Sequence, residues 1–122
     1  MILLETNIMA GFPSPAEGAT NHRLSLDDIV IQHPEATFFM KMQGEAMVPF
    51  GIFPNDILVV DRALTPRAGS MVVVFLAGEW LVRRLARSAQ GWYLESAEGL
   101  LVLDQSLETM VWGVVSSTVH KL

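Results

Sequence analysis

The feature that most constrains the fold of this chain is a series of β-rich runs that begins at Thr37. Val, Phe, Trp and Thr, which fit the pleated surface of a sheet, are concentrated in these runs, and Gly, Pro or Asn separates them. Ala77 and Gly78 between two runs can close a hairpin, because glycine adopts positive φ at little cost. The sequence therefore predicts a mainly β fold with strands at residues 37–43, 56–61, 70–76, 79–86, 92–96 and 110–120.

One short helix is predicted before the first of these strands. Ser25 is suited to the N-cap, Asp28 follows at the third helical position, and Pro34 prevents continuation. About two turns fit between these signals. Further on, residues 47–51 are too short and too interrupted by proline for a strand, which predicts a tight turn or a single helical turn with residue 46 at its start.

The chain has 122 residues, 51% of them apolar, which suffices for one buried core and leaves no room for a second domain. Residues 10–21 are rich in Gly, Pro, Ala and Ser, and Pro13 and Pro15 remove backbone donors and favour extended conformations. We therefore expect a flexible N-terminal arm over residues 1–22 and a single β domain over residues 23–122.

Composition excludes several classes of function. Eight basic and thirteen acidic residues give a net charge of −5, which argues against direct DNA binding, because neutralising phosphates requires clustered Lys and Arg. The chain has no cysteine, which excludes disulfides and thiolate chemistry and fits a reducing cytoplasm. Residues 1–10 lack the basic start of a signal peptide, and the longest later apolar run, 71–77, is too short to span a membrane. A soluble, cytoplasmic protein is expected.

Metal and cofactor sites are not indicated. His22, His33 and His120 are widely spaced, and no carboxylate–histidine cluster suggests a metal ligand set. Asp56 and Asp61 are interpreted as strand-end residues rather than a general acid and base. The three tryptophans are interpreted as core or interface anchors, and no nucleotide-binding glycine loop is found. We expect no cofactor and no metal.

Three segments carry a family motif. Residues 44–47 read Gly-Glu-Ala-Met, residues 51–60 read Gly-Ile-Phe-Pro-Asn-Asp-Ile-Leu-Val-Val, and residues 82–85 read Val-Arg-Arg-Leu. In that order they resemble the signature of the self-cleaving LexA/UmuD proteins (peptidase family S24): Gly-Asp-Ser-Met, Gly-Ile-x-x-Gly-Asp before apolar residues, and Val-Lys-(Lys/Arg)-Leu. Gly-Phe-Pro-Ser-Pro-Ala at 11–16 and Trp-Gly-Val-Val at 112–115 extend the resemblance, to UmuD in particular. The resemblance implies the β-clip type of fold of the LexA/UmuD C-terminal domain.

The resemblance also implies which residues stand at the catalytic positions. Ala46 occupies the position of the family's serine nucleophile and Arg83 that of its lysine base, 37 positions further on, a separation similar to the family's. Alanine has no oxygen to attack a peptide bond, and arginine stays protonated and cannot act as a base. The bond that the family cuts resembles Ala10–Gly11 here. We therefore expect a serine-peptidase frame that is inactive as written.

Three functions are compatible with this resemblance. The first is a UmuD-like accessory subunit of the SOS response, which forms a homodimer, binds a Y-family translesion polymerase subunit (UmuC-like) and contacts the RecA filament. The second is an inactivated form, natural or engineered, of a self-cleaving Ser/Lys peptidase that cuts its own arm at Ala10–Gly11. The third is a repressor-type dimerisation domain. It is the weakest of the three, because LexA repressors place a helix-turn-helix before this domain and this chain has only a short arm there.

Overall fold

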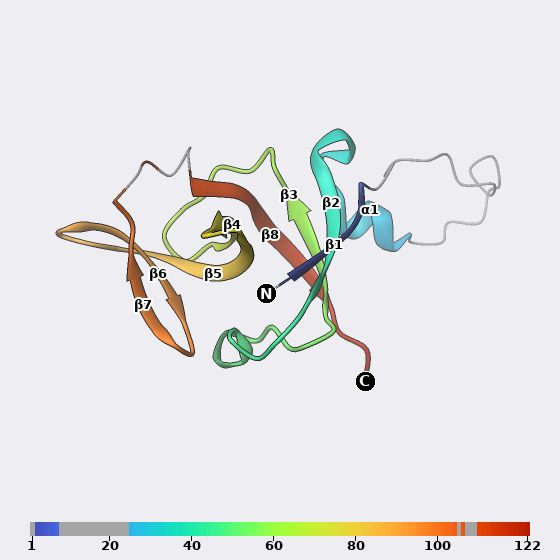
Figure 1. Ribbon diagram of the computed structural model, residues 1–122. Helices are drawn as coiled ribbons and strands as arrows, with labels where there is room; N and C mark the ends of the chain where they lie inside the picture. The colour runs from blue at the N-terminus through green and yellow to red at the C-terminus, as the bar shows by residue number, and fades with distance from the viewer. Residues whose placement is uncertain (1, 8–24, 105, 107–109) are drawn as a thin grey trace.

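The computed structural model describes residues 2–7, 25–104, 106 and 110–122. The strands form one antiparallel sheet in the order β1-β2-β3-β8-β4-β5-β6-β7 (Figure 1). The predicted mainly β fold with a short helix is confirmed. The strands are β1 (Ile2–Asn7), β2 (Thr37–Met42), β3 (Ile57–Asp61), β4 (Met71–Leu76), β5 (Glu79–Ser88), β6 (Gly91–Ser96), β7 (Gly99–Val102) and β8 (Val111–Val119).

All six predicted strands are present, with ends that differ from the prediction by at most two residues. Two strands were not predicted. Strand β7 has only four residues, and β1 lies within residues 1–22, for which the sequence predicts an arm. The backbone of β1 pairs with β2, from Ile2 opposite Met42 to Asn7 opposite Phe38. The predicted cleavage site, Ala10–Gly11, lies outside the described residues.

The helix α1 (Leu26–Val30) begins where the sequence predicts and is shorter than two turns. The side chain of Ser25 accepts a hydrogen bond from the backbone N–H of Asp27 at 3.2 Å, which confirms Ser25 as the N-cap. Leu26 and Ile29 are 56% and 58% exposed, so the apolar side chains of this helix are not buried against the described part of the domain. No helix in the described residues is long and apolar enough to cross a membrane.

The hairpin between β4 and β5 is the one that the sequence predicts. Leu76 and Glu79 are paired across the strands, so Ala77 and Gly78 form a two-residue turn. Both turn residues have positive φ, 50° and 80°, as the favoured hairpin turns with this twist require. Glycine adopts this conformation freely, but alanine does so at a cost.

Strand β8 carries two register irregularities that bend the sheet. Val73 pairs with Gly113 and Val74 with Val111, which leaves Trp112 as the extra residue of a bulge, and a second irregularity lies opposite Val59 and Val60. The sheet curls so that β1 contacts β5 as well as β2 (Figure 1). Two buried clusters result, one of Met40, Met42, Met47, Ile52, Leu58, Val60, Val73 and Val82, the other of Val72, Val74, Leu85, Leu94, Leu103 and Val114.

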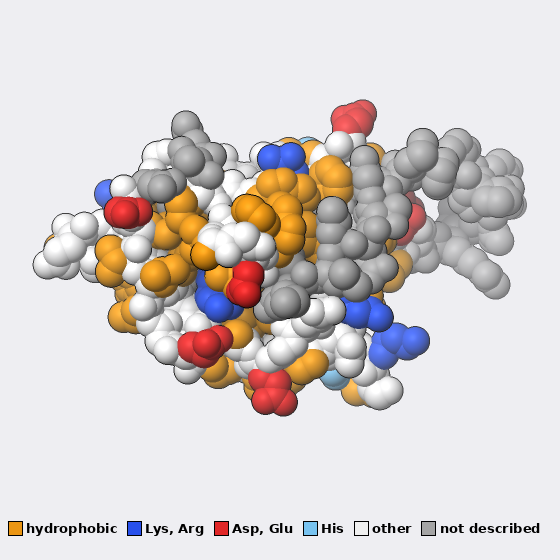
Figure 2. All heavy atoms as spheres, in the orientation of Figure 1, with side chains coloured by type: hydrophobic (Ala, Val, Ile, Leu, Met, Phe, Trp, Pro, Cys, Tyr) orange, Lys and Arg blue, Asp and Glu red, His pale blue; other side chains and the backbone are white. Residues whose placement is uncertain are grey.

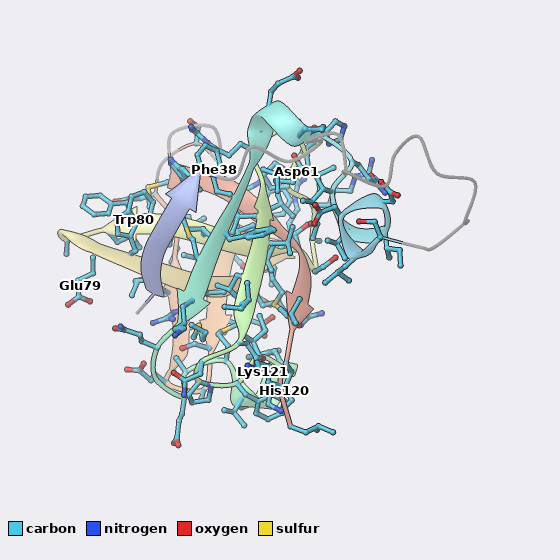
Figure 3. The ribbon with its side chains drawn as sticks, turned by 90° about the vertical axis from the view of Figure 1, so that its right-hand side faces the viewer. Phe38, Asp61, Glu79, Trp80, His120 and Lys121 are labelled. Atoms are coloured by element: carbon cyan, nitrogen blue, oxygen red, sulfur yellow. The ribbon has the colours of Figure 1, made fainter. Side chains whose placement is uncertain are left out.

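Aromatic rings from four strands form a row. Phe75 contacts Trp80, Trp80 contacts Trp112, and Trp112 contacts Phe38, with ring centroids between 4.9 and 5.3 Å apart. Phe38 and Trp80 lie on the same side of the molecule, near β1 (Figure 3). Trp80 and Trp112 also pack against the first buried cluster. Their packing agrees with the interpretation of these tryptophans as core anchors.

Candidate functional site

Ala46 lies in the turn that follows β2. Gly44 has a φ of 80°, which turns the chain, and the single helical turn η2 (Val48–Phe50) follows, as the sequence predicts. Ala46 is partly buried and packs against the first buried cluster. Its carbonyl oxygen accepts a hydrogen bond from the backbone N–H of Ala97 at 2.7 Å, which ties this turn to the turn between β6 and β7.

Arg83 lies on β5, and its side chain is only 13% exposed. One guanidinium nitrogen donates to the carbonyl oxygen of Val82 at 2.8 Å. Another lies 3.8 Å from the carboxylate of Glu98, whose side chain is 76% exposed. A guanidinium does not release its proton in proteins, so Arg83 supplies a fixed positive charge here rather than a base.

The two predicted catalytic positions meet the same turn. Ala46 contacts Ala97 through the backbone, and Arg83 approaches Glu98, the next residue of the turn between β6 and β7. Arg83 is paired opposite Val72, a member of the second buried cluster, whereas Ala46 packs against the first. The β6–β7 turn is therefore contacted by the backbone of Ala46 and by the side chain of Arg83.

The neighbouring Arg84 makes a shorter ion pair than Arg83. Its guanidinium donates to the carboxylate of Glu95 at 2.9 Å, directly across the β5–β6 pair. Its guanidinium carbon also lies 5.8 Å from the centre of the Phe50 ring, which links β5 to the helical turn after Ala46. The segment after β2, strand β5 and the β6–β7 turn are thus connected by three separate polar or cation–aromatic contacts.

Asn55 departs from the family motif, which has glycine before the aspartate. In the structure Asn55 has a φ of 71°, the left-handed conformation. Asparagine adopts that conformation more readily than other residues with a Cβ, which explains how it replaces glycine here. Asp56 follows, with only 1% of its surface exposed, and its carboxylate accepts a hydrogen bond from the backbone N–H of Phe53 at 2.8 Å.

The structure also shows two carboxylate–histidine pairs that the sequence does not predict. His120 Nδ1 lies 2.5 Å from Asp56 Oδ1, and His33 Nδ1 lies 2.6 Å from Asp61 Oδ2. Figure 3 shows Asp61 and His120 at opposite ends of the molecule. The wide spacing of the histidines along the chain therefore gives no indication of these two contacts. The paired residues are 28 and 64 positions apart, so no local motif could reveal them.

Within the described part of the chain, neither pair is part of a larger group of potential metal ligands. Among the described residues, no group of three or more His, Cys, Asp or Glu side chains could hold a metal ion. A structural role explains both pairs, because each buried carboxylate also accepts a backbone hydrogen bond: Asp56 from Phe53, and Asp61 from Ala63 at 2.8 Å. Asp61 is the last residue of β3 and Asp56 directly precedes that strand, in agreement with their interpretation as strand-end residues.

A mainly β domain with one short helix is consistent with one class of protein, the LexA/UmuD type of β domain. The sequence matches the peptidase S24-like family over residues 2–111. It is 38% identical to protein MucA of Salmonella typhimurium over 112 residues, which cover 89% of this chain and 77% of that protein. It is 35% identical to protein ImpA of Shigella flexneri over 122 residues, which cover 98% of this chain and 83% of that protein.

A more distant relative is the LexA repressor of Dechloromonas aromatica. It is 32% identical over 124 residues, which cover 95% of this chain but only 61% of the repressor. The matches to MucA, ImpA and LexA all extend over most of this chain rather than over a short motif. The chain belongs to the peptidase S24-like family of LexA/UmuD proteins.

Proposed function

We propose that this chain is a UmuD-like accessory subunit that binds a Y-family translesion polymerase subunit and does not cleave itself. Its family membership and its similarity to MucA and ImpA support the first part. The residues at the predicted catalytic positions, Ala46 and Arg83, support the second. As the family resemblance implies, the subunit acts as a homodimer in the SOS response and contacts the RecA filament.

The observation that carries the loss of cleavage is the pair of side chains themselves. A serine nucleophile needs a base that removes its proton, and a lysine can be that base only when it is neutral. Ala46 has no hydroxyl group, and Arg83 keeps its positive charge beside Glu98. Alanine at position 46 removes the nucleophile and arginine at position 83 removes the base, and either change alone should prevent cleavage.

Co-purification tests the binding role. The chain should remain bound to its cognate polymerase subunit through gel filtration, and sedimentation of the free chain should give twice the mass of one polypeptide. A chain that stays monomeric and binds no translesion polymerase subunit would contradict the proposal. A gel-shift assay with the free chain should show no retarded DNA at physiological salt, because the net charge is −5.

A second candidate function is the self-cleaving peptidase of which this chain is an inactivated form. The separation between Ala46 and Arg83 and the sequence that follows Ala10–Gly11 favour it. The double substitution Ala46→Ser with Arg83→Lys should then restore cleavage at Ala10–Gly11, most readily at alkaline pH, where lysine loses its proton more easily. Intact-mass measurement of the folded double variant decides this, with each single substitution as a control.

Glu98 sharpens that experiment. Its carboxylate lies 3.8 Å from the Arg83 guanidinium, and a nearby negative charge favours the protonated form of any amine placed there. Adding Glu98→Gln to the double variant should therefore shift the onset of cleavage to lower pH. If the folded double and triple variants stay intact at every pH, the peptidase candidate is wrong and the binding role is unaffected.

A further inference from the structure

Strand β7 forms one edge of the sheet. It pairs with β6 on one side, with Leu100 opposite Glu95, Leu101 opposite Leu94 and Val102 opposite Tyr93. The order of the described strands ends at β7, so the backbone groups on its other side are paired with no described strand. Such an edge is a template for pairing with an extended segment of another chain.

The side chains of this edge are apolar on both faces. Leu100, Leu101 and Val102 are 67%, 46% and 75% exposed. Figure 2 shows hydrophobic side chains gathered on the left of the view, where β6 and β7 lie in Figure 1. Edge strands usually carry lysine, proline or a bulge that prevents pairing, and residues 99–102 have none of these. The edge therefore keeps both the backbone and the side chains that a partner strand requires.

The charges at the two ends of β7 limit what can bind there. Glu98 directly precedes the strand and its side chain is 76% exposed, and Asp104 follows the strand and is also exposed. Arg83 lies 3.8 Å from this carboxylate, and the Glu98 side chain remains largely open to solvent. An apolar strand with a negative charge at each end is complementary to an apolar segment with a positive charge at each end.

A second copy of this edge does not meet that requirement. If two β7 strands paired antiparallel about Leu101, Glu98 of one copy would lie opposite Asp104 of the other, at both ends of the pair. Like charges directly opposite each other destabilise a strand pair. The chain's own arm does not meet the requirement either, because residues 1–22 contain Glu5 and Glu17 and no Lys or Arg.

We propose that the β7 edge, residues 98–104, binds an extended apolar segment of a partner protein that is flanked on both sides by Lys or Arg, and that this segment adds a strand to the sheet. The inference rests on the proposed function, since it names the surface and the partner chemistry of the accessory subunit. Backbone hydrogen bonds provide the affinity, Leu100 and Val102 select apolar side chains, and Glu98 and Asp104 select the basic flanks.

A library of short peptides tests the proposal without any knowledge of the partner. The central positions vary among Val, Ile, Leu, Thr, Phe and Tyr, and the flanks are either lysine or glutamate. The immobilised native chain should enrich lysine-flanked peptides over glutamate-flanked ones, and the amides of residues 99–102 should become protected from hydrogen exchange in the complex. Absence of this enrichment, or protection elsewhere in the chain, would overturn the proposal.

Substitutions then locate the site. The double substitution Leu100→Thr with Val102→Thr keeps the β propensity of the strand and should lower the affinity of the chain for the enriched peptide about tenfold. Asp104→Lys should lower the affinity for this peptide about fivefold. Glu79→Lys makes the same charge change at an exposed position of β5 and should leave the affinity unchanged. Ile29→Thr on α1 is the matched apolar control. Equal binding by the β7 variants and the native chain would show that the peptide binds elsewhere.

The same variants separate this inference from the proposed function. If the native chain and the β7 double variant both bind the polymerase subunit, the inference is wrong and the accessory role stands. If the native chain binds the lysine-flanked peptide at β7 but binds no polymerase subunit, the proposed function is wrong and the edge site stands. Loss of self-association in the β7 variants would identify a second copy as the occupant and would also overturn the inference.

Discussion

Strands β3 and β7 belong to one sheet, but the structure secures them in opposite ways. β3 lies between β2 and β8, and four of its five residues are buried, whereas all four residues of β7 are exposed at the edge. Buried carboxylates also lie at both ends of β3: Asp56 is hydrogen-bonded to His120, and Asp61 is hydrogen-bonded to His33. The domain therefore concentrates its fixed contacts around β3 and leaves β7 with few.

The largest expected effect concerns the buried carboxylate before β3. Asp56→Ala removes the acceptor of the Phe53 N–H and the partner of His120, and it should lower the free energy of unfolding by about 2 to 4 kcal/mol. Urea unfolding followed by tryptophan fluorescence measures this. His120→Ala leaves the bond to Phe53 in place and should cost about 1 kcal/mol. Equal losses in the two variants would show that the histidine contact dominates.

A smaller effect is expected where β8 passes β3. A Cβ added at Gly113 would lie 2.7 Å from Val60 Cγ1 and 3.3 Å from Arg62 Cγ, so neighbouring groups must move. Gly113→Ala should therefore lower the free energy of unfolding by about 1 to 3 kcal/mol. Thr118→Ala at an exposed position of the same strand is the control and should change it little. A fully stable Gly113→Ala variant would mean that the side chains of Val60 and Arg62 can shift to make room without cost.

The hairpin between β4 and β5 offers a gain in stability. Ala77 has a φ of 50°, a conformation that costs alanine energy and that asparagine tolerates, and Asn-Gly is the preferred sequence for this turn. Ala77→Asn should raise the free energy of unfolding by about 0.5 to 1 kcal/mol, measured by urea unfolding. Ala77→Val should lower it, because β-branched residues strongly disfavour positive φ. Loss of stability in the asparagine variant would contradict the turn geometry.

The difference between β3 and β7 also explains which strands could be predicted. β3 is a continuous run of apolar, mostly β-branched residues with a clear end at Asp61, and such runs are recognised from the sequence alone. β7 has four residues, and its pairing with β6 depends on a turn at Ala97 and Glu98 that has no strong turn signal. β1 is not evident from the sequence, because Glu5 and Asn7 interrupt its apolar run and its pairing partner, β2, lies about 35 residues further along the chain.

The candidate site was predictable only where a local motif exists. The positions of Ala46 and Arg83 follow from their motifs, and the prediction that they form the dyad site remains a prediction. That both adjoin the β6–β7 turn depends on long-range contacts to Ala97 and Glu98. The pairing of His120 with Asp56 likewise depends on two chain segments that only the folded sheet brings together.

The smallest effect on stability is expected in β7, and comparing it with a similar substitution in β3 tests the difference between these two strands directly. Leu100→Thr with Val102→Thr in β7 should change the free energy of unfolding by less than about 0.5 kcal/mol, because both side chains are mostly solvated already. The same kind of change in β3, Val60→Thr, buries a hydroxyl group in the first core cluster and should cost about 1 to 3 kcal/mol. Urea unfolding of both variants measures the difference. A large loss of unfolding free energy in the β7 variant would show that this edge stabilises the domain itself. A small loss would mean that the apolar side chains of the edge are not needed for stability, as expected of a strand that binds a partner.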